Sequence, residues 1–419
     1  MNKILIVLFA VVLFLLIDYY VFQAIRHLMA NSSITAKNTV RITYWSVTAI
    51  TIGGFLLFHF ANPDLMSRVA RNFIVTGIFV NYFSKIFVVF FLFMDDIIRA
   101  GKWVVMQFQG ENKTQMGLEG GKISRSDFLT KTALIAGAIP AVAMGFGIIS
   151  GAYDYRVRRK TVFLPNLPKE FDGLKIAQLS DIHSGSFFNK TAVNGGVDLL
   201  LKQKPDVVFF TGDLVNTYAD EVKNYIDVFS RVKAPLGVYS TLGNHDYGDY
   251  AQWKSEAAKA KNLQQLIAAH HEMDWDILMN ENRTLKEGNG KISIIGVENW
   301  GAGRFAKYGD LNKAYQGSEE GDVKLLLSHD PSHWDAQIKP DFPAIDLTFS
   351  GHTHGFQFGI EVGNIKWSPV KYFYKQWAGL YHDENQYLYV NRGYGFLGFP
   401  GRIGMPPEIT IIELKKGAA

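Results

Sequence analysis

Long apolar runs dominate the first part of the chain and predict helices that cross a membrane. Each run approaches the roughly 20 apolar residues that a helix needs to span the hydrocarbon core of a bilayer. The runs cover residues 4–25, 43–60, 73–94 and 132–153. The last of them is rich in Gly and Ala, which let helices pack closely in lipid. Residues 1–153 are therefore expected to form a membrane domain with about four transmembrane helices.

Two features of these runs allow alternative interpretations. The first run could be a cleaved signal peptide, but further spans follow it and no small-residue cleavage site is clear. Asp18 in the first run and Lys85 in the third could be functional groups inside the membrane. We prefer a structural interpretation, because each lies near a span end or can pair within the helix bundle.

The basic residues of the connecting loops indicate on which side of the membrane the rest of the chain lies. Their distribution favours an extracytoplasmic position, with a cytoplasmic one as the alternative. Residues 124–129 read Ser-Arg-Ser-Asp-Phe-Leu and are similar to a twin-arginine export signal with one arginine missing. We therefore expect a multi-pass protein of a bacterial inner membrane, with its soluble part facing outward.

After residue 153 the pattern changes to short apolar runs separated by segments of helical spacing. Runs of this length, rich in β-branched and aromatic residues, are typical of buried strands. Strands that alternate with helices predict a layered α/β architecture. We expect a linker at 154–172 and a soluble domain at 173–419. The predicted strands are 174–179, 206–210, 238–242, 292–297, 323–327, 347–349, 387–390 and 408–414.

Composition narrows the range of functions. The formal net charge is only +4, whereas a nucleic-acid-binding protein is expected to carry a clear basic excess. The chain has no cysteine, which excludes disulfides, thiolate metal sites and cysteine nucleophiles. The absence of cysteine does not fix the cellular compartment.

Five short motifs follow predicted strands and carry side chains that bind divalent metals. Together they supply seven candidate ligands for two adjacent metal ions and one further histidine. A pair of such ions can hold a phosphate ester and generate a hydroxide beside it. The motifs are Asp181-Ile-His183, Gly212-Asp213, Gly243-Asn244-His245-Asp246, Ser328-His329 and Gly351-His352-Thr353-His354.

The spacing within the motifs suggests how the ligands converge. Asp181 and His183 are two residues apart, so on an extended segment both side chains point to one side. Asp213 has two carboxylate oxygens and can bridge two ions. Asn244 offers a neutral amide oxygen, which leaves positive charge in the site for a phosphate. Ligands just beyond strand C-termini lie where open α/β sheets place their sites.

These motifs resemble those of the calcineurin-like metallophosphoesterase superfamily, over about residues 175–414. The segments 391–395 and 406–409 are similar to that family as well. The preceding membrane spans resemble the layout of membrane-anchored bacterial phosphodiesterases and of transmembrane proteins with a metallophosphoesterase domain. The resemblance implies an α/β fold in which two mixed sheets pack between helices, as a four-layer α-β-β-α sandwich.

The resemblance also implies roles for individual residues. Asp213 would bridge the two metals, and His245 would stay off both. The metals would be Mn²⁺, Fe²⁺ or Fe³⁺, or Zn²⁺, and the sequence does not choose among them. The remaining ligands would be Asp181, His183 and His354 for the first metal, and Asn244, His329 and His352 for the second.

The mechanism implied is in-line attack on phosphorus by a hydroxide shared between two ions. His245 would give a proton to the leaving alkoxide, and its alternative role is a structural hydrogen bond. Many relatives carry Gly-Asp-x-x-Asp, whereas this chain has Asn216 at the last place. If that position orients the catalytic histidine, Asn216 would do so without charge.

We expect a membrane-anchored phosphoesterase acting on a phosphodiester, phosphomonoester or pyrophosphate, with an amphiphilic substrate preferred. The partners are then the phosphate ester and membrane lipid, and the oligomeric state is open. The alternative is a non-catalytic metal-binding scaffold on the same fold. Aromatic residues after the last motif could form an apolar approach for a lipid-bearing substrate, or could serve packing instead. They are Trp367, Tyr372, Phe373, Tyr374, Trp377 and Tyr381.

Overall fold

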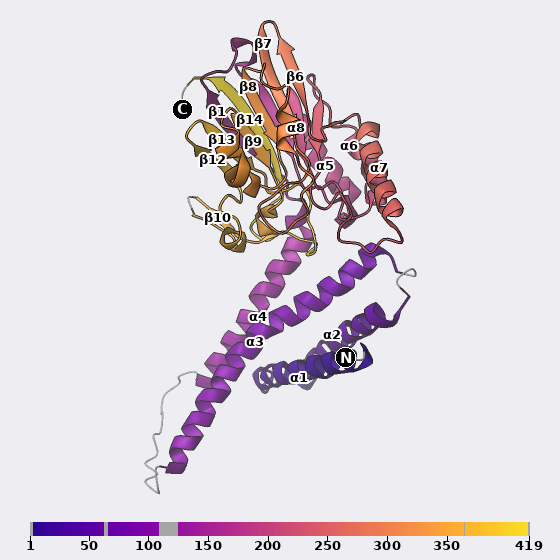
Figure 1. Ribbon diagram of the computed structural model, residues 1–419. Coiled ribbons are helices and arrows are strands. Elements are labelled where there is room, and N and C mark those ends of the chain that lie inside the picture. Colours follow the sequence, from indigo (N-terminus) through magenta and orange to yellow (C-terminus); the bar gives the residue numbers. More distant parts are fainter. Residues whose placement is uncertain (1–2, 63–65, 109–124, 364, 418–419) are drawn as a thin grey trace. The chain divides into compact units, whose positions relative to one another are not determined.

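The computed structural model describes residues 3–62, 66–108, 125–363 and 365–417. By contacts between residues the chain divides into two compact units (Figure 1). The N-terminal unit is Met1–Phe146, and the C-terminal unit is Gly147–Ala419. Ser124, the first residue of the segment similar to a twin-arginine signal, lies outside the described residues.

The N-terminal unit is built from long helices: α1 Lys3–Leu28, α2 Ile34–Phe60 and α3 Arg68–Phe108, with α4 Arg125–Ile149 running past its end. In the described residues, four segments are long and apolar enough to cross a membrane. They are Lys3–Leu28, Ile34–Phe60, Val69–Val105 and Phe128–Tyr153. The helices α2 and α3 are longer than their apolar runs, because charged and polar residues at a span end interrupt hydropathy without interrupting the helix.

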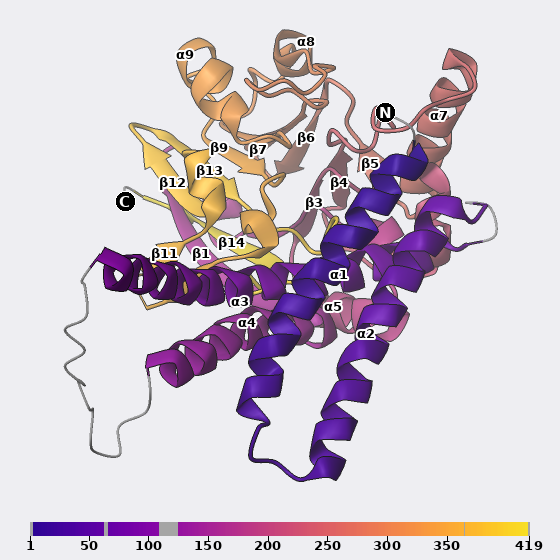
Figure 2. The same ribbon diagram turned by 90° about the horizontal axis from the view of Figure 1, so that it is seen from below.

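Helices α1 and α2 lie side by side and are joined by a short turn (Figure 2). Asp18 of α1 is fully buried and pairs with Lys85 of α3. The hydroxyls of Tyr82 and Tyr44 donate to the same carboxylate at 3.0 and 3.2 Å. The two charged residues noted in the sequence therefore satisfy each other within the bundle, as buried charges must.

Helix α4 approaches α3 through a small residue. A Cβ built on Gly137 would lie 2.3 Å from Cγ2 of Val88, so no larger residue fits there without movement. Close backbone approach of this kind is how helices pack in lipid, where burial against water gives no driving force.

The C-terminal unit contains two six-stranded mixed sheets. The first has the order β1-β14-β2-β3-β4-β5, with β2 to β5 parallel and β14 antiparallel to β2. Its strands are β1 Arg156–Leu164, β2 Lys175–Leu179, β3 Val207–Thr211, β4 Val238–Thr241, β5 Asp276–Ile277 and β14 Glu408–Lys416.

The second sheet has the order β12-β13-β9-β8-β7-β6, in which β13, β9, β8 and β7 are parallel. Its strands are β6 Glu281–Glu287, β7 Gly290–Gly296, β8 Val323–Leu327, β9 Leu347–Ser350, β12 Gly379–Asp383 and β13 Gln386–Val390. A separate hairpin pairs β10 Ile360–Val362 with β11 Ile365–Trp367. The helices are α5 Lys190–Leu201, α6 Ile226–Phe229, α7 Glu256–Glu272, α8 Leu311–Tyr315 and α9 Lys339–Asp341.

Side-chain alternation along the strands builds the layers. In β3, Val207 and Phe209 enter the core between the two sheets, where Phe209 meets Phe349 of β9 at a ring-centroid distance of 5.0 Å. Val208 and Phe210 enter the core under α5, α6 and α7. A third core joins the outer face of the second sheet to α8. The predicted four-layer α-β-β-α sandwich of two mixed sheets is thus confirmed.

One boundary needs correction: residues 154–172, expected to be a linker, contain β1. This strand pairs in parallel with β14 over its whole length. Its sequence, Arg-Val-Arg-Arg-Lys-Thr-Val-Phe-Leu, has too many charges to read as a strand from hydropathy. It lies at a sheet edge, where charged side chains face solvent and discourage pairing with other molecules. The polar edge strand β6 escaped prediction for the same reason.

Candidate metal centre

The predicted ligands all lie at the carboxyl ends of parallel strands. Asp181 and His183 follow β2, Asp213 follows β3, and Asn244 follows β4 in the first sheet. The remaining three follow β8 and β9 in the second sheet: His329, His352 and His354. Because the two sheets pack face to face, these ends meet at one edge, as expected for a site in an open α/β sheet.

The local backbone differs from the extended geometry expected for the Asp181-Ile-His183 motif. Both flanking residues are left-handed, with φ of 51° and 47°, and Ile182 between them is fully buried. Asp213 has a φ of 61°. Non-glycine residues adopt this region rarely and at a cost, so such positions concentrate at functional sites. A tight turn, not strand alternation, brings the two side chains to one side.

The first group of donors consists of Asp181, His183 and His354, and all three are buried. The Oδ1 atom of Asp181 lies 3.2 Å from Nε2 of His354. The Nε2 atoms of His354 and His183 face each other at 3.0 Å. Two imidazole lone pairs at this distance repel unless a proton or a cation lies between them.

The second group consists of Asp213, His329 and His352. Oδ2 of Asp213 lies 3.1 Å from Nε2 of His329 and 3.5 Å from Nε2 of His183, a residue of the first group. The Nδ1 atom of His352 is 3.3 Å from Nε2 of His329 and 2.8 Å from Oδ1 of Asn244. One carboxylate oxygen therefore lies between the two groups.

The donor set fits divalent metals that take carboxylate oxygen together with imidazole nitrogen. Outer hydrogen bonds fix which ring nitrogen is available, as is usual for metal-binding histidines. Nδ1 of His183 is 3.1 Å from Oδ1 of Asn216, and Nδ1 of His329 donates to the Thr211 carbonyl at 2.7 Å. In both rings Nε2 is left to face the carboxylate of Asp213.

The charges of the site are strongly coupled. Burial lowers the pKa of His183 well below its usual value, although Asp213 opposes this shift. Burial would also lower the pKa of His329, but the charges of Asp213 and Asp181, with the hydrogen bonds to Asp213 and to the Thr211 carbonyl, together raise that pKa to about 10. A divalent ion bound at this place would replace the proton of His329 as the partner of the carboxylate.

His245 belongs to neither donor group and is half-buried beside them. Its ring lies 5.0 Å from that of His183, measured between centroids. Its Nδ1 is 2.8 Å from the main-chain carbonyl of Asn216. The side chain of Asn216 reaches His183 instead, so the condition that this side chain orients His245 is not met. The main-chain carbonyl of Asn216 orients His245.

Asp246 is part of the Gly-Asn-His-Asp motif, but the sequence predicts no role for it. Its buried carboxylate accepts hydrogen bonds from the N–H groups of Asp213, Leu214, Val215 and Gly243 at 2.8 to 3.3 Å. Burial, followed by the charge of Asp213, raises its pKa to about 7. Asp246 thereby ties the loop after β3 to the loop after β4.

Two tyrosines and a second acid surround the second donor group, and the sequence predicts no role at the site for them. The Tyr250 hydroxyl accepts from Nδ2 of Asn244 at 2.7 Å, which turns the amide oxygen toward His352. The Tyr374 hydroxyl is 2.8 Å from Nε2 of His352, and Oδ2 of the buried Asp330 is 3.8 Å from the same nitrogen. Tyr374 was noted only as part of an aromatic cluster, and Asp330 directly follows the His329 motif.

Arg402 had no signal in the sequence, yet it is fully buried behind the first group. Its guanidinium donates to the carbonyls of Gly395, Arg392, Gly393 and Met405 at 2.5 to 3.2 Å, and Nη2 is 3.3 Å from Nδ1 of His354. Burial lowers its pKa to about 10, so it stays charged at neutral pH. Arg402 holds the loop after β13 against the site.

Comparison with known proteins agrees with this geometry. Residues 174–356 match the family model of calcineurin-like phosphoesterases. An uncharacterized metallophosphoesterase of Bacillus subtilis, YkuE, is 31% identical over 306 residues, which cover 70% of this chain and 98% of that protein. The chain belongs to the calcineurin-like metallophosphoesterase family. It is a metal-dependent phosphoester hydrolase.

The N-terminal unit has relatives of its own. Residues 2–152 match a family model described as a probable calcineurin-like phosphoesterase transmembrane domain. The zebrafish (Danio rerio) transmembrane protein with metallophosphoesterase domain is 28% identical over 90% of this chain and 80% of its own length. An uncharacterized metallophosphoesterase of Campylobacter jejuni is 27% identical over 86% of this chain and 96% of its own. This metallophosphoesterase is thus a membrane protein.

Replacement of Arg402 tests its role as the support of the first donor group. In Arg402→Met the buried carbonyls lose their donors, and each unsatisfied group costs about 1–3 kcal/mol. We expect the free energy of unfolding to fall by about 3 kcal/mol or more, and the melting temperature of the detergent-solubilised full chain to drop. The control Arg283→Met removes a partly exposed guanidinium that pairs with Asp276 and Glu281, and should cost about 1 kcal/mol or less. Equal melting temperatures for the two variants would contradict this role.

Proposed function

We propose that this metallophosphoesterase uses a dinuclear metal centre to hydrolyse a phosphate ester carried by an amphiphile. One observation carries the proposal: a single carboxylate oxygen of Asp213 lies within 3.5 Å of a histidine nitrogen from each donor group. Asp213 would bridge two ions. The other proposed ligands are Asp181, His183 and His354 for one ion, and Asn244, His329 and His352 for the other.

Two bound divalent ions would supply a hydroxide at neutral pH and would neutralise the phosphate oxygens. The chain itself supplies the proton for the leaving group. His245 is the proposed donor, because Nδ1 is engaged by the Asn216 carbonyl and Nε2 remains available for the leaving alkoxide. The oxygen and nitrogen donors suit Mn²⁺, iron or Zn²⁺ alike.

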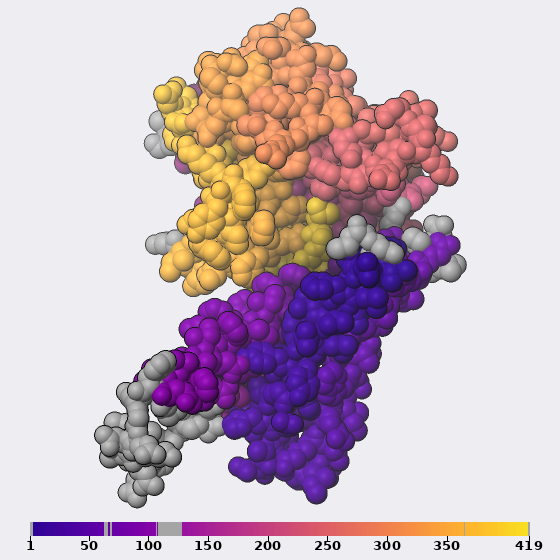
Figure 3. Space-filling view, turned by 60° about the horizontal axis from the view of Figure 1, so that its bottom comes forward, coloured from indigo at the N-terminus to yellow at the C-terminus, as the bar shows by residue number. Residues whose placement is uncertain are grey.

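An apolar surface beside the proposed centre supports an amphiphilic substrate. Among the described residues, seven of the twelve large apolar side chains exposed in the C-terminal unit lie within residues 356–373. This segment directly follows His354 and lies at the surface of the unit, in gold (Figure 3). The seven are Phe356, Phe358, Ile360, Val362, Ile365, Tyr372 and Phe373, here called the apolar rim.

The aromatic cluster considered in the sequence divides between packing and exposure. Trp377 is buried in a small core with Val370 and Met405. Tyr372 and Phe373 are more than two-thirds exposed. Exposed apolar groups in such a cluster are typical of a surface that meets another apolar phase. Acyl or isoprenoid chains of a phosphodiester, phosphomonoester or pyrophosphate could lie on this rim while the phosphate reaches the metals.

The alternative of a non-catalytic scaffold is disfavoured by the completeness of the site. The proposed ligands all converge, and His245 stands beside them with its backbone partner. For the sidedness we keep the extracytoplasmic placement, in a bacterial inner membrane, as a proposal. It rests on the basic residues of the loops and on the similarity of residues 124–129 to a twin-arginine export signal.

Metal content tests the ligand assignment. We expect the purified full chain to bind two divalent ions, and His352→Ala to keep only the ion of the first group. Asp213→Ala should lose both ions or bind them far more weakly, because the shared ligand is gone. Elemental analysis after dialysis against Mn²⁺ measures the stoichiometry, and circular dichroism confirms that each variant is folded. One ion in the unaltered chain, or two in folded Asp213→Ala, would refute the shared-carboxylate centre.

Turnover of a phosphodiester whose leaving group is an alkoxide tests the role of His245, because p-nitrophenolate leaves without a proton. With Mn²⁺ present, His245→Ala should lower kcat roughly 10²–10⁴-fold, the usual contribution of general acid catalysis. Its metal content should stay unchanged, because His245 is not a proposed ligand. His271→Ala, which removes an exposed histidine from α7, is the matched control. The proposed role fails if His245→Ala keeps full activity, or if its loss of activity follows a loss of metal.

A pair of substrates that differ only in chain length tests the apolar rim. Dodecyl p-nitrophenyl phosphate should be preferred over methyl p-nitrophenyl phosphate, measured as kcat/KM below micelle-forming concentrations. In Phe373→Ser/Val362→Ser this preference should fall roughly 30-fold, because two apolar contacts of about 1 kcal/mol each are lost. Turnover of the methyl ester should be unchanged. Phe163→Ser, which alters a partly exposed ring on β1, should change neither value. An unaltered preference in the double variant would reject an amphiphile on this rim.

A further inference from the structure

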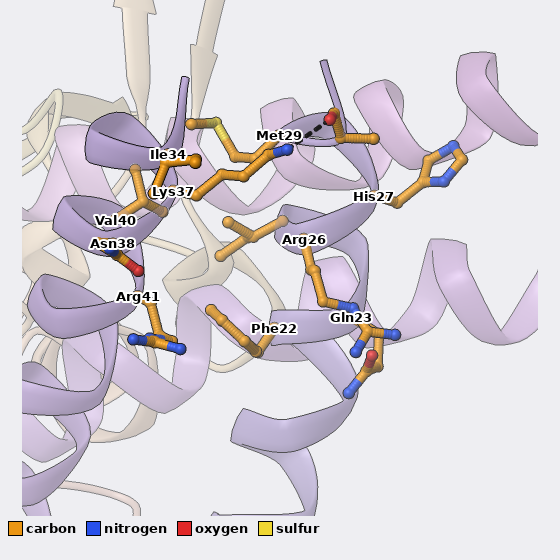
Figure 4. Close-up of a pocket in the computed structure, with 12 residues that line it drawn as sticks. Phe22, Gln23, Arg26, His27, Met29, Ile34, Lys37, Asn38, Val40 and Arg41 are labelled. Atoms are coloured by element: carbon orange, nitrogen blue, oxygen red, sulfur yellow. Dashed lines mark hydrogen bonds between the residues drawn. The ribbon is translucent and has the colours of Figure 1, made fainter. Parts of the chain in front are cut away.

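A cavity of about 610 Å³ lies at the turn between α1 and α2, within the N-terminal unit (Figure 4). Its walls come from the last two turns of α1, from the turn itself, and from the first two turns of α2. It takes no part in the site described above, since its lining residues all fall within 22–41.

The cavity is lined by positive charges, and no acidic residue lies near them in the sequence. Arg26, Lys37 and Arg41 line it, while no Asp or Glu occurs anywhere in residues 19–63. Among the described residues, neither guanidinium forms an ion pair. Lys37 donates from Nζ to the carbonyl of Ala30 at 2.7 Å, which keeps its charge at the turn.

The acids of α3 that come near α1 are already engaged. The Tyr20 hydroxyl donates to Oδ2 of Asp96 at 2.5 Å. Arg99 pairs with Asp96 and, at 3.2 Å, with Asp95. The cations of the cavity therefore keep their charge available for an external anion.

Two further features of the cavity determine which ligand it can bind. The N-terminus of α2, a helix of 27 residues capped by Ser33, adds the partial positive charge of a helix start to the same place. Of the nine other lining residues, six are apolar and three are polar. The apolar ones are Phe22, Ile25, Met29, Ala30, Ile34 and Val40, and the polar ones are Gln23, His27 and Asn38. Phe22 is held by Tyr44 and Trp45 at ring distances of 5.2 and 5.7 Å.

We propose that this cavity binds the phosphate headgroup of an anionic phospholipid, with the start of its acyl chains against the apolar wall. Arg26 and Arg41 come from facing helices and can hold phosphate oxygens from two sides, since guanidinium matches phosphate geometry. Basic pockets between membrane helices bind anionic headgroups by the same chemistry. This proposal does not depend on the proposed catalytic function.

Lipid binding to the full chain in a neutral detergent tests the site. We expect short-chain phosphatidylglycerol to bind more tightly than phosphatidylcholine of equal chain length. Arg26→Gln/Arg41→Gln should weaken phosphatidylglycerol binding about 30-fold, since each cation contributes about 1 kcal/mol. Arg26→Lys/Arg41→Lys keeps both charges and should retain most of the affinity. This second variant separates loss of charge from loss of folding.

The matched control removes two charges far from the α1–α2 turn: Lys3 at the start of α1, and Arg71 on α3 near the end of α2. Lys3 donates to the carbonyl of His59 at 2.6 Å, and Arg71 lies over the ring of Phe58 at 5.5 Å. Lys3→Gln/Arg71→Gln lowers the net charge by the same amount and should leave phosphatidylglycerol binding unchanged. Equal weakening in both double variants would overturn the site in favour of a general charge effect.

Inorganic phosphate distinguishes the two sources of the same chemistry. We expect millimolar phosphate to compete poorly with phosphatidylglycerol, because the apolar wall contributes only when a chain is present. If phosphate binds as tightly as the lipid, the site is an anion site and the lipid proposal is wrong. Equal binding of phosphatidylcholine and phosphatidylglycerol would also overturn it.

Discussion

Asp213 holds its carboxylate between two groups of donors, 3.5 Å from His183 on one side and 3.1 Å from His329 on the other. The neighbouring residues of the centre hold this carboxylate in position. The left-handed backbone at Asp213 aims the side chain into the site, and Oδ1 accepts the N–H of His245 at 2.9 Å. Asp246 fixes the same loop through backbone hydrogen bonds. Gly243 is required because a Cβ there would lie 2.2 Å from Oδ1 of Asp213.

The placement also explains why two sheets are needed. His183 follows a strand of the first sheet, and His329 follows a strand of the second. Phe209 and Phe349, on the facing strands β3 and β9, meet in the core between the sheets. The packing of this core sets the distance between the two edges and so the spacing of the donors. Rigid strands hold ligands more accurately than mobile loops do.

Much of this was visible in the sequence. Buried strands read as short apolar runs, and each metal-binding motif follows one, so convergence at a carboxyl edge could be predicted. The sequence did not reveal backbone conformation, because a left-handed residue looks like any other Asp or His. It also did not reveal contacts between residues far apart in the chain, such as those that Arg402 makes with the loop after β13. The strand β1 was missed because its stability comes from pairing with β14 and not from its own hydropathy.

Two surfaces of this metallophosphoesterase are proposed to bind lipid, one in each unit. The C-terminal unit carries the apolar rim beside the proposed metals, and the N-terminal unit carries a cationic cavity with an apolar wall. In a membrane protein, both surfaces would contact molecules that partition into the bilayer. The central claim, however, concerns the metals. Anomalous diffraction from crystals grown with Mn²⁺ tests it most directly. The account predicts two peaks that share the carboxylate of Asp213, with His245 bound to neither, whereas a single peak or two peaks without a common Asp213 ligand would contradict it.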